Sequence, residues 1–144
     1  MTRPARSIFR SLHRWRRGAT AIEFGLLFST FLMMFFGIMD WGWMFFRRSQ
    51  FMDAVLDGTR RAVTRSQTDV SLPPAQAAVE YTEANLVAYG IDPNLTTIEA
   101  SYSGVSPAEV LIVTAWMPYE PLIGMWPTPD TINAQMSMYL EIQD

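Results

Sequence analysis

The apolar and polar positions divide the chain into one long apolar run and a mixed body. Residues 24–46 read FGLLFSTFLMMFFGIMDWGWMFF, and Asp40 is the single charged residue in this run. At about 1.5 Å per residue, a helix of this length spans roughly 34 Å, which exceeds the bilayer hydrocarbon core of about 30 Å. A buried core helix is the alternative, but the rest of the chain offers little with which to surround it. The pattern predicts one transmembrane helix.

Helical spacing of apolar residues continues beyond this run. Over residues 47–65 the apolar side chains recur every three or four positions between arginines and aspartates, which predicts an amphipathic extension of the span with a soft point at Gly58. Residues 66–74 have the composition of a linker. Residues 75–89 then predict a short helix that Gly90 can cap.

The period changes to two in the last third of the chain. Residues 96–102 and 109–117 are rich in Val, Ile, Thr and aromatic residues, and turn residues separate them. In the final stretch, every second residue is apolar, so that one face packs and the other meets water. These apolar residues are Ile132, Ala134, Met136, Met138, Leu140 and Ile142. We predict an α+β fold in which a long N-terminal helix precedes a short helix and a small three-stranded antiparallel sheet.

Charge is distributed very unevenly. All eleven basic residues are arginines; six precede Gly18 and none follows Arg65, whereas the charged residues beyond Gln67 are all acidic. Arginines beside an apolar span favour a cytoplasmic N-terminus and contact with anionic lipid, and their position makes nucleic-acid binding improbable. The apolar run is too long, and ends in residues too bulky, for a cleaved secretory signal.

A carboxylate, Glu23, stands at the entrance to the apolar run. A carboxylate near a helix N-terminus is stabilised by about 0.3–1 kcal/mol through the helix dipole. The alternative is that the Glu23 side chain snorkels to the membrane interface and has no particular role. The order of a basic leader, Gly18, Ala19 and then Glu23 resembles the class III signal of type IV pilins. The resemblance implies cleavage after Gly18 by a prepilin peptidase and makes Glu23 the fifth residue of the mature chain. Glu23 would then be the subunit-assembly acid, paired with the new α-amine of a neighbouring subunit.

A closer resemblance covers residues 16–46. The start GATAIEF and the ending GIMDWG resemble the TadE-like family of tight-adherence (Tad, Flp-type) pilus systems. DAVLDGTRRAV, residues 53–63, resembles the small-residue helix that follows the span in that family. The usual proline in the span is absent, with Ser29 and Thr30 nearby instead.

The resemblance implies a pilin-like minor pilin or pseudopilin that assembles, primes or caps an adhesive Tad pilus. Its parts would be a cleaved cytoplasmic leader (1–18), the membrane helix with its extension (19–65) and a small periplasmic head (66–144). Its expected location is the bacterial inner membrane, as a single-pass protein; the sequence leaves open whether it enters the pilus fibre, caps it or only primes its assembly. The implied partners are the prepilin peptidase, other pilins and pseudopilins, the Tad inner-membrane assembly platform and membrane lipid. The alternative is an uncleaved, membrane-anchored periplasmic binding module.

Two further sites remain open from the sequence. Asp40, an intramembrane acid, is expected either to pair with Arg47 or Arg48 or to meet a cation of a partner protein. The loop after residue 117 contains four prolines and an apolar set, Leu122, Ile123, Met125 and Trp126. Apolar residues on a stiffened loop suit a contact surface. The alternative is that Ile123 and Trp126 plug the open end of the sheet.

Catalytic chemistry has little support. The chain has no cysteine, and its single histidine, His13, lies in the leader. A Ser-His-Asp arrangement or a histidine-rich metal site is therefore not expected. We predict that the protein is not an enzyme and uses neither metal nor cofactor.

Overall fold

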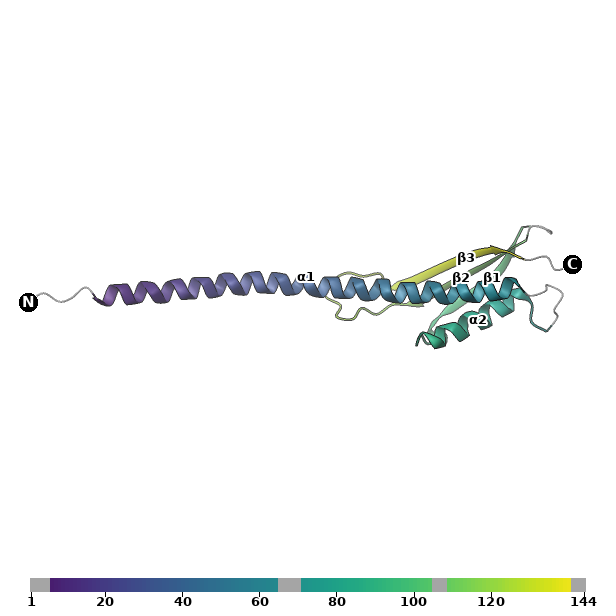
Figure 1. Ribbon diagram of the computed structural model, residues 1–144, viewed down its shortest axis with the longest axis horizontal. Helices are drawn as coiled ribbons and strands as arrows, with labels where there is room; N and C mark the ends of the chain where they lie inside the picture. The colour runs from purple at the N-terminus through teal and green to yellow at the C-terminus, as the bar shows by residue number, and fades with distance from the viewer. Residues whose placement is uncertain (1–5, 65–70, 105–108, 141–144) are drawn as a thin grey trace, which may run out of the picture.

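The computed structural model describes residues 6–64, 71–104 and 109–140, with side chains described from Gly18 onward. A single helix, α1 (Arg6–Val63), forms a long rod, and the other elements gather around its C-terminal half (Figure 1). They are α2 (Pro74–Ala88), a 3-10 turn (Pro93–Leu95), and the strands β1 (Thr97–Ser103), β2 (Val110–Pro118) and β3 (Thr131–Tyr139). The α+β prediction is confirmed, and each strand begins within one residue of its predicted start.

The three strands form one antiparallel sheet in the order β1-β2-β3. Val113 lies opposite Ala100 on one side and Met136 on the other, and it is fully buried. The alternation predicted for the last strand is confirmed for Ile132 and Ala134, which are buried, whereas Ile142 lies outside the described residues. One face of the sheet is therefore the core face.

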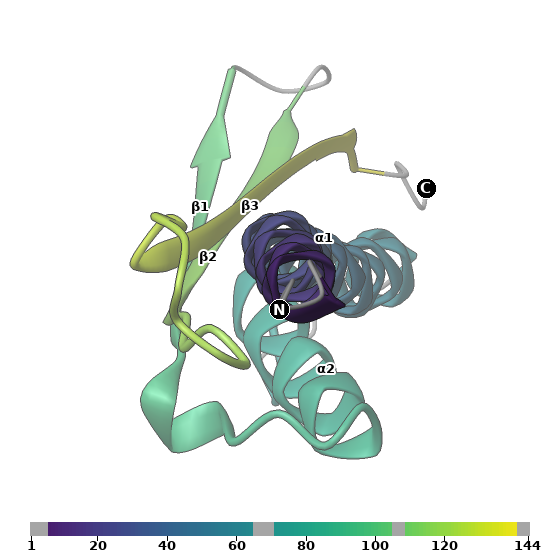
Figure 2. The same ribbon diagram turned by 90° about the vertical axis from the view of Figure 1, so that its left-hand side faces the viewer.

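Two helices supply the other side of the core. α1 packs against α2 and against β3, while α2 also packs against β1 (Figure 2). The fully buried contacts include Phe51 and Val55 of α1 and Leu86 of α2. Each buried side chain of this size contributes about 1.5–3 kcal/mol relative to its exposed state. The C-terminal half of α1 is thus part of the head and not a separate stalk.

Gly58 of α1 lies directly against Thr82 of α2. A Cβ built on it would stand 2.8 Å from the backbone nitrogen of Thr82 and even closer to the Thr82 Oγ1. α1 continues unbroken through this position to Val63. The expectation of a soft point at Gly58 is therefore wrong; the glycine is there because α2 leaves no room for a side chain.

The part of α1 before Met33 stands free of the head. Residues 18–63 contain an apolar window long enough to cross a membrane, and only 6% of that window is buried inside the protein. Large side chains such as Phe24, Leu26 and Leu27 are exposed. The Ser29 and Thr30 hydroxyls donate to the carbonyls of Gly25 (2.8 Å) and Leu26 (2.9 Å), so these polar groups are satisfied within the helix. Such a helix suits a membrane anchor and does not behave as a buried core helix.

Candidate functional site

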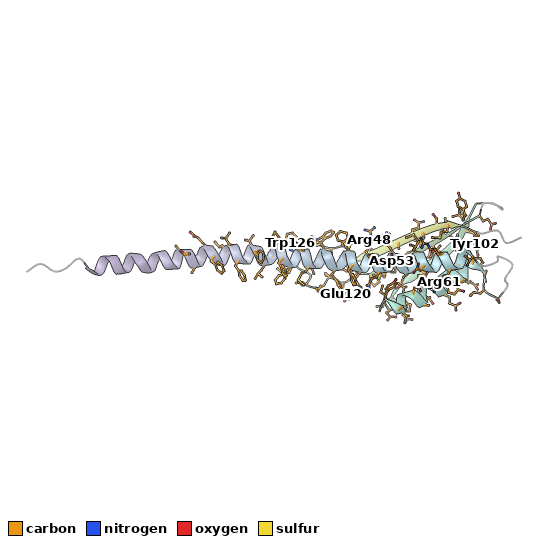
Figure 3. The ribbon with its side chains drawn as sticks, in the orientation of Figure 1. Arg48, Asp53, Arg61, Tyr102, Glu120 and Trp126 are labelled. Carbon is orange, nitrogen blue, oxygen red and sulfur yellow. The ribbon has the colours of Figure 1, made fainter. Side chains whose placement is uncertain are left out.

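The segment between β2 and β3, residues 119–130, is here called the return loop. The Tyr119 amide donates to the Asp130 carbonyl (2.9 Å) and closes its base. From this base the loop runs back along α1, away from the sheet (Figure 1). Figure 3 shows Trp126 beside α1 on the N-terminal side of Arg48, with Glu120 nearer the head. The loop therefore reaches the apolar half of the helix.

Asp40 fixes the tip of the return loop. Its carboxylate is fully buried and accepts hydrogen bonds from the backbone amides of Ile123 (2.7 Å), Gly124 (3.1 Å) and Met125 (3.3 Å). Gly124 has a φ of +75°, a left-handed conformation that glycine adopts without strain. Successive amides converging on one carboxylate form an anion-binding concavity. The loop backbone thus takes the place of a counter-cation.

Neither expected intramolecular partner of Asp40 is used. Among the ion pairs of the described residues there is none between Asp40 and Arg47 or Arg48, and the Arg47 guanidinium instead lies 5.8 Å from the ring centre of Trp43. The physical reason is that three aligned amides enclose the carboxylate and leave no side open to a long side chain. The predicted pairing with Arg47 or Arg48 is wrong. A cation from a partner protein is also not needed, because the three amides satisfy the Asp40 carboxylate.

Tyr119 adds a second connection at the same helix position. Its hydroxyl donates to the Asp40 backbone carbonyl (3.2 Å), and its side chain is buried. Burial, and secondarily the Asp40 carboxylate, raise the pKa of Tyr119. The phenol therefore stays protonated, and remains a donor, throughout the physiological pH range.

Trp126 is seated on α1 itself. Its indole Nε1 donates to the Met33 carbonyl (3.0 Å), and a Cβ on Gly37 would lie 2.6 Å from this nitrogen. Only a glycine at position 37 leaves space for the ring. The structure places Trp126 against the apolar half of α1 and not at the open end of the sheet. The hypothesis that the loop contacts another protein stays a prediction.

Gly37 and Asp40 lie three residues apart and therefore on one face of α1. Both belong to the GIMDWG motif, and both serve the return loop, whereas a Cβ on Gly42 would meet nothing within 4 Å. Sequence reasoning singled out Asp40 but did not connect it with Gly37. Two sequence features could have indicated that a loop docks on this face of the helix. They are the three-residue spacing between Gly37 and Asp40 and the proline-rich loop farther along the chain.

Beside Trp126 the surface is hollowed. An open, almost wholly apolar hollow of about 300 Å³ is lined by residues of α1 and by Trp126. The helix residues are Met34, Gly37, Ile38 and Trp41. Its lining has no charged side chain, so the hollow suits an apolar side chain or an acyl chain and not an ionic ligand.

The predicted processing site lies near the other end of α1. The Gly18–Ala19 bond lies inside the continuous helix, and both residues are exposed. Glu23, one turn farther on, is also exposed. In the part of the chain that the structure describes, no group of three or more His, Cys, Asp or Glu side chains is arranged to hold a metal ion.

Together, the free apolar helix and the head indicate a membrane-anchored α+β protein, with one candidate spanning helix among the described residues. Residues 18–60 match the family model described as TadE-like protein, which confirms the resemblance over that segment. The match includes Glu23, Gly37, Asp40 and Gly58, and it indicates a Tad pilus-associated, minor-pilin-like protein. Searches of curated proteins and of solved structures each found no match.

Proposed function

We propose that this protein is a minor pilin or pseudopilin of a Tad pilus or secretion system, processed after Gly18 by a prepilin peptidase. The observation that carries the proposal is the TadE-like match, whose first residue is the glycine at the proposed cleavage site. The new N-terminus would be Ala19, at the start of an exposed apolar helix. Assembly, priming or capping of an adhesive pilus is the function that such a helix and head would perform.

The chemistry at the new N-terminus supports this proposal. Cleavage creates an α-amine at Ala19, and Glu23 lies four residues beyond it, about one helical turn. Glu23 is exposed, and no hydrogen bond or ion pair of its side chain occurs among the described contacts. A carboxylate without a partner is costly in hydrocarbon, so association with a neighbouring subunit's amine is favoured once helices bundle.

The shape of the molecule suits this role. Large apolar side chains are exposed along α1 from Ile22 to Phe35 and offer a surface to other membrane helices. The head lies wholly at the opposite end (Figure 1). We infer that the leader faces the cytoplasm and the head the periplasm, with other pilins and the inner-membrane assembly platform as partners.

The test is the N-terminal residue of the protein recovered from membranes of cells with and without the prepilin peptidase. The proposal expects Ala19 in the first case and the full leader in the second. A Gly18→Leu variant should keep its leader in both strains, whereas Gly25→Leu, a matched substitution in the same helix, should be processed normally. An intact leader in peptidase-containing cells would support the uncleaved anchored binding module instead.

A further inference from the structure

The tip of the return loop is apolar and exposed. Leu122, Ile123, Met125 and Trp126 are each between 39% and 53% exposed. Of these four, Trp126 lines the apolar hollow together with Met34 and Ile38 of α1, which are also exposed. The loop therefore extends the apolar surface of the membrane helix sideways.

The polar groups of this tip are arranged for a place with little water. The amides of Ile123, Gly124 and Met125 all donate to Asp40, and the Trp126 indole donates to the Met33 carbonyl. The flanking prolines, at positions 121, 127 and 129, carry no amide hydrogen. These bonds satisfy three amides and the indole N–H of the tip, as a position at the edge of the hydrocarbon requires.

The depth of the loop follows from its contacts with α1. A span over residues 24–46 would place Met33 and Gly37, and with them Trp126, near the bilayer midplane. Lipid-exposed irregular backbone does not occur at that depth. A span that begins at Gly18, directly after the arginines of the leader, reaches about 30 Å at Ile38. The loop tip then lies at the boundary between hydrocarbon and headgroups.

We propose that the return loop is a membrane-interface element that inserts Leu122, Ile123, Met125 and Trp126 into the leaflet on the side of the head. Asp40 marks the boundary of the hydrocarbon and holds the loop at this depth through its three amide bonds. The occupant of the apolar tip and of the hollow beside Trp126 is lipid. This inference goes beyond the proposed function and does not depend on it.

The aromatic residues of α1 agree with this position of the bilayer. Trp41 and Trp43 follow Asp40 and fall in the headgroup layer, which tryptophan favours. The ring centres of Trp41 and Phe45 lie 5.9 Å apart, and those of Trp43 and Phe46 lie 5.6 Å apart. The two phenylalanines extend the aromatic belt toward the head. Arg47, over the Trp43 ring, completes the belt on the side of the lipid phosphates.

The test uses the absence of cysteine from the sequence, which allows single spin labels without a prior cysteine-free variant. Leu122→Cys places a label on the loop tip. Leu27→Cys, at a 72% exposed position in the span, is the hydrocarbon reference, and Tyr139→Cys, at a 74% exposed position at the end of β3, is the water reference. The labelled full-length proteins are placed in vesicles of phosphatidylethanolamine and phosphatidylglycerol. Their accessibility to oxygen, which concentrates in hydrocarbon, is compared with that to a water-soluble nickel chelate.

We expect the oxygen-to-nickel ratio at position 122 to exceed that at position 139 several-fold and to stay below that at position 27, because position 27 lies deeper in the hydrocarbon. Adding Asp40→Asn should lower the ratio at position 122 and leave the ratio at position 27 unchanged. A ratio at position 122 equal to that at position 139 would overturn the proposal. Shielding from both reagents that grows with the protein-to-lipid ratio would also overturn it, because the loop would then contact another protein.

Discussion

The Asp40 carboxylate and the Ile123 amide, which lie 83 residues apart in the sequence, form a 2.7 Å hydrogen bond. This bond joins the middle of α1 to the tip of a loop that belongs to the sheet. Hydrogen bonds to a charged group are shorter and stronger than those between neutral groups. Besides the core around Phe51, the head is therefore attached to α1 through the return loop, at Asp40 and at the Met33 carbonyl.

The first prediction concerns this attachment. Asp40→Asn removes the charge and turns an NH₂ group toward amides that are themselves donors. We expect the loop attachment to lose about 1.5–3 kcal/mol, the range for hydrogen bonds to charged groups. Hydrogen exchange of the Ile123, Gly124 and Met125 amides in detergent micelles should accelerate, while the strands exchange as before.

Asp53→Asn is the matched control because Asp53 lies on the same helix and is exposed. It should leave the exchange of the loop amides unchanged. Equal exchange rates in Asp40→Asn and the wild type would show that the carboxylate does not hold the loop.

The second prediction concerns the packing of Trp126 against Gly37 of α1. Gly37→Ala introduces a Cβ about 2.6 Å from the indole nitrogen, so the ring must leave the Met33 carbonyl. Overpacking of this kind costs about 1–3 kcal/mol, although alanine gains about 1 kcal/mol in helix propensity. Limited proteolysis should cut the return loop faster in Gly37→Ala than in the wild type.

Gly42→Ala is the control, since a Cβ there meets nothing within 4 Å. In a Trp126→Ala background, Gly37→Ala should have no further effect because the clash has been removed. An equal acceleration in both backgrounds would mean that Gly37 acts through something other than Trp126.

The local elements of this fold could be predicted from the sequence because their signals are local. The alternation in β3 shows which side faces the core, and Gly90, with a φ of +68°, ends α2 where predicted. The partners of Asp40 could not be predicted in this way. Backbone amides carry no residue-specific signature, whereas Arg47 and Arg48 are visible in the sequence as cations on the same helix. The donors to Asp40 come instead from the loop that follows β2.

The third prediction concerns the α1–α2 contact. Gly58→Ala places a Cβ against both the backbone and the hydroxyl of Thr82, and backbone gives way less easily than a side chain. We expect a loss of about 1–3 kcal/mol in the free energy of unfolding of the head. Thermal unfolding followed by circular dichroism in detergent micelles measures it.

Thr82→Ala removes the hydroxyl but leaves the backbone in place, so it should relieve the Gly58→Ala defect only in part. Gly25→Ala, in the free half of α1, should leave the unfolding temperature of the head unchanged. A Gly58→Ala protein as stable as the wild type would mean that α2 can shift away at little cost.

The last prediction concerns Glu23 and rests on the proposed function. Glu23→Gln keeps the size of the side chain and removes the charge that an α-amine of a neighbouring subunit would pair with. Since Glu23 has no role in the head, membrane insertion, protein level and cleavage after Gly18 should be unchanged. The amount of the protein that co-purifies with the major pilin from sheared or detergent-solubilised cells should fall strongly. Glu83→Gln, an exposed acid on α2, is the control and should co-purify normally. Equal recovery of Glu23→Gln and the wild type would show that this carboxylate has no role in assembly. If the leader is still cleaved in that variant, the proposal of processing after Gly18 would be unaffected.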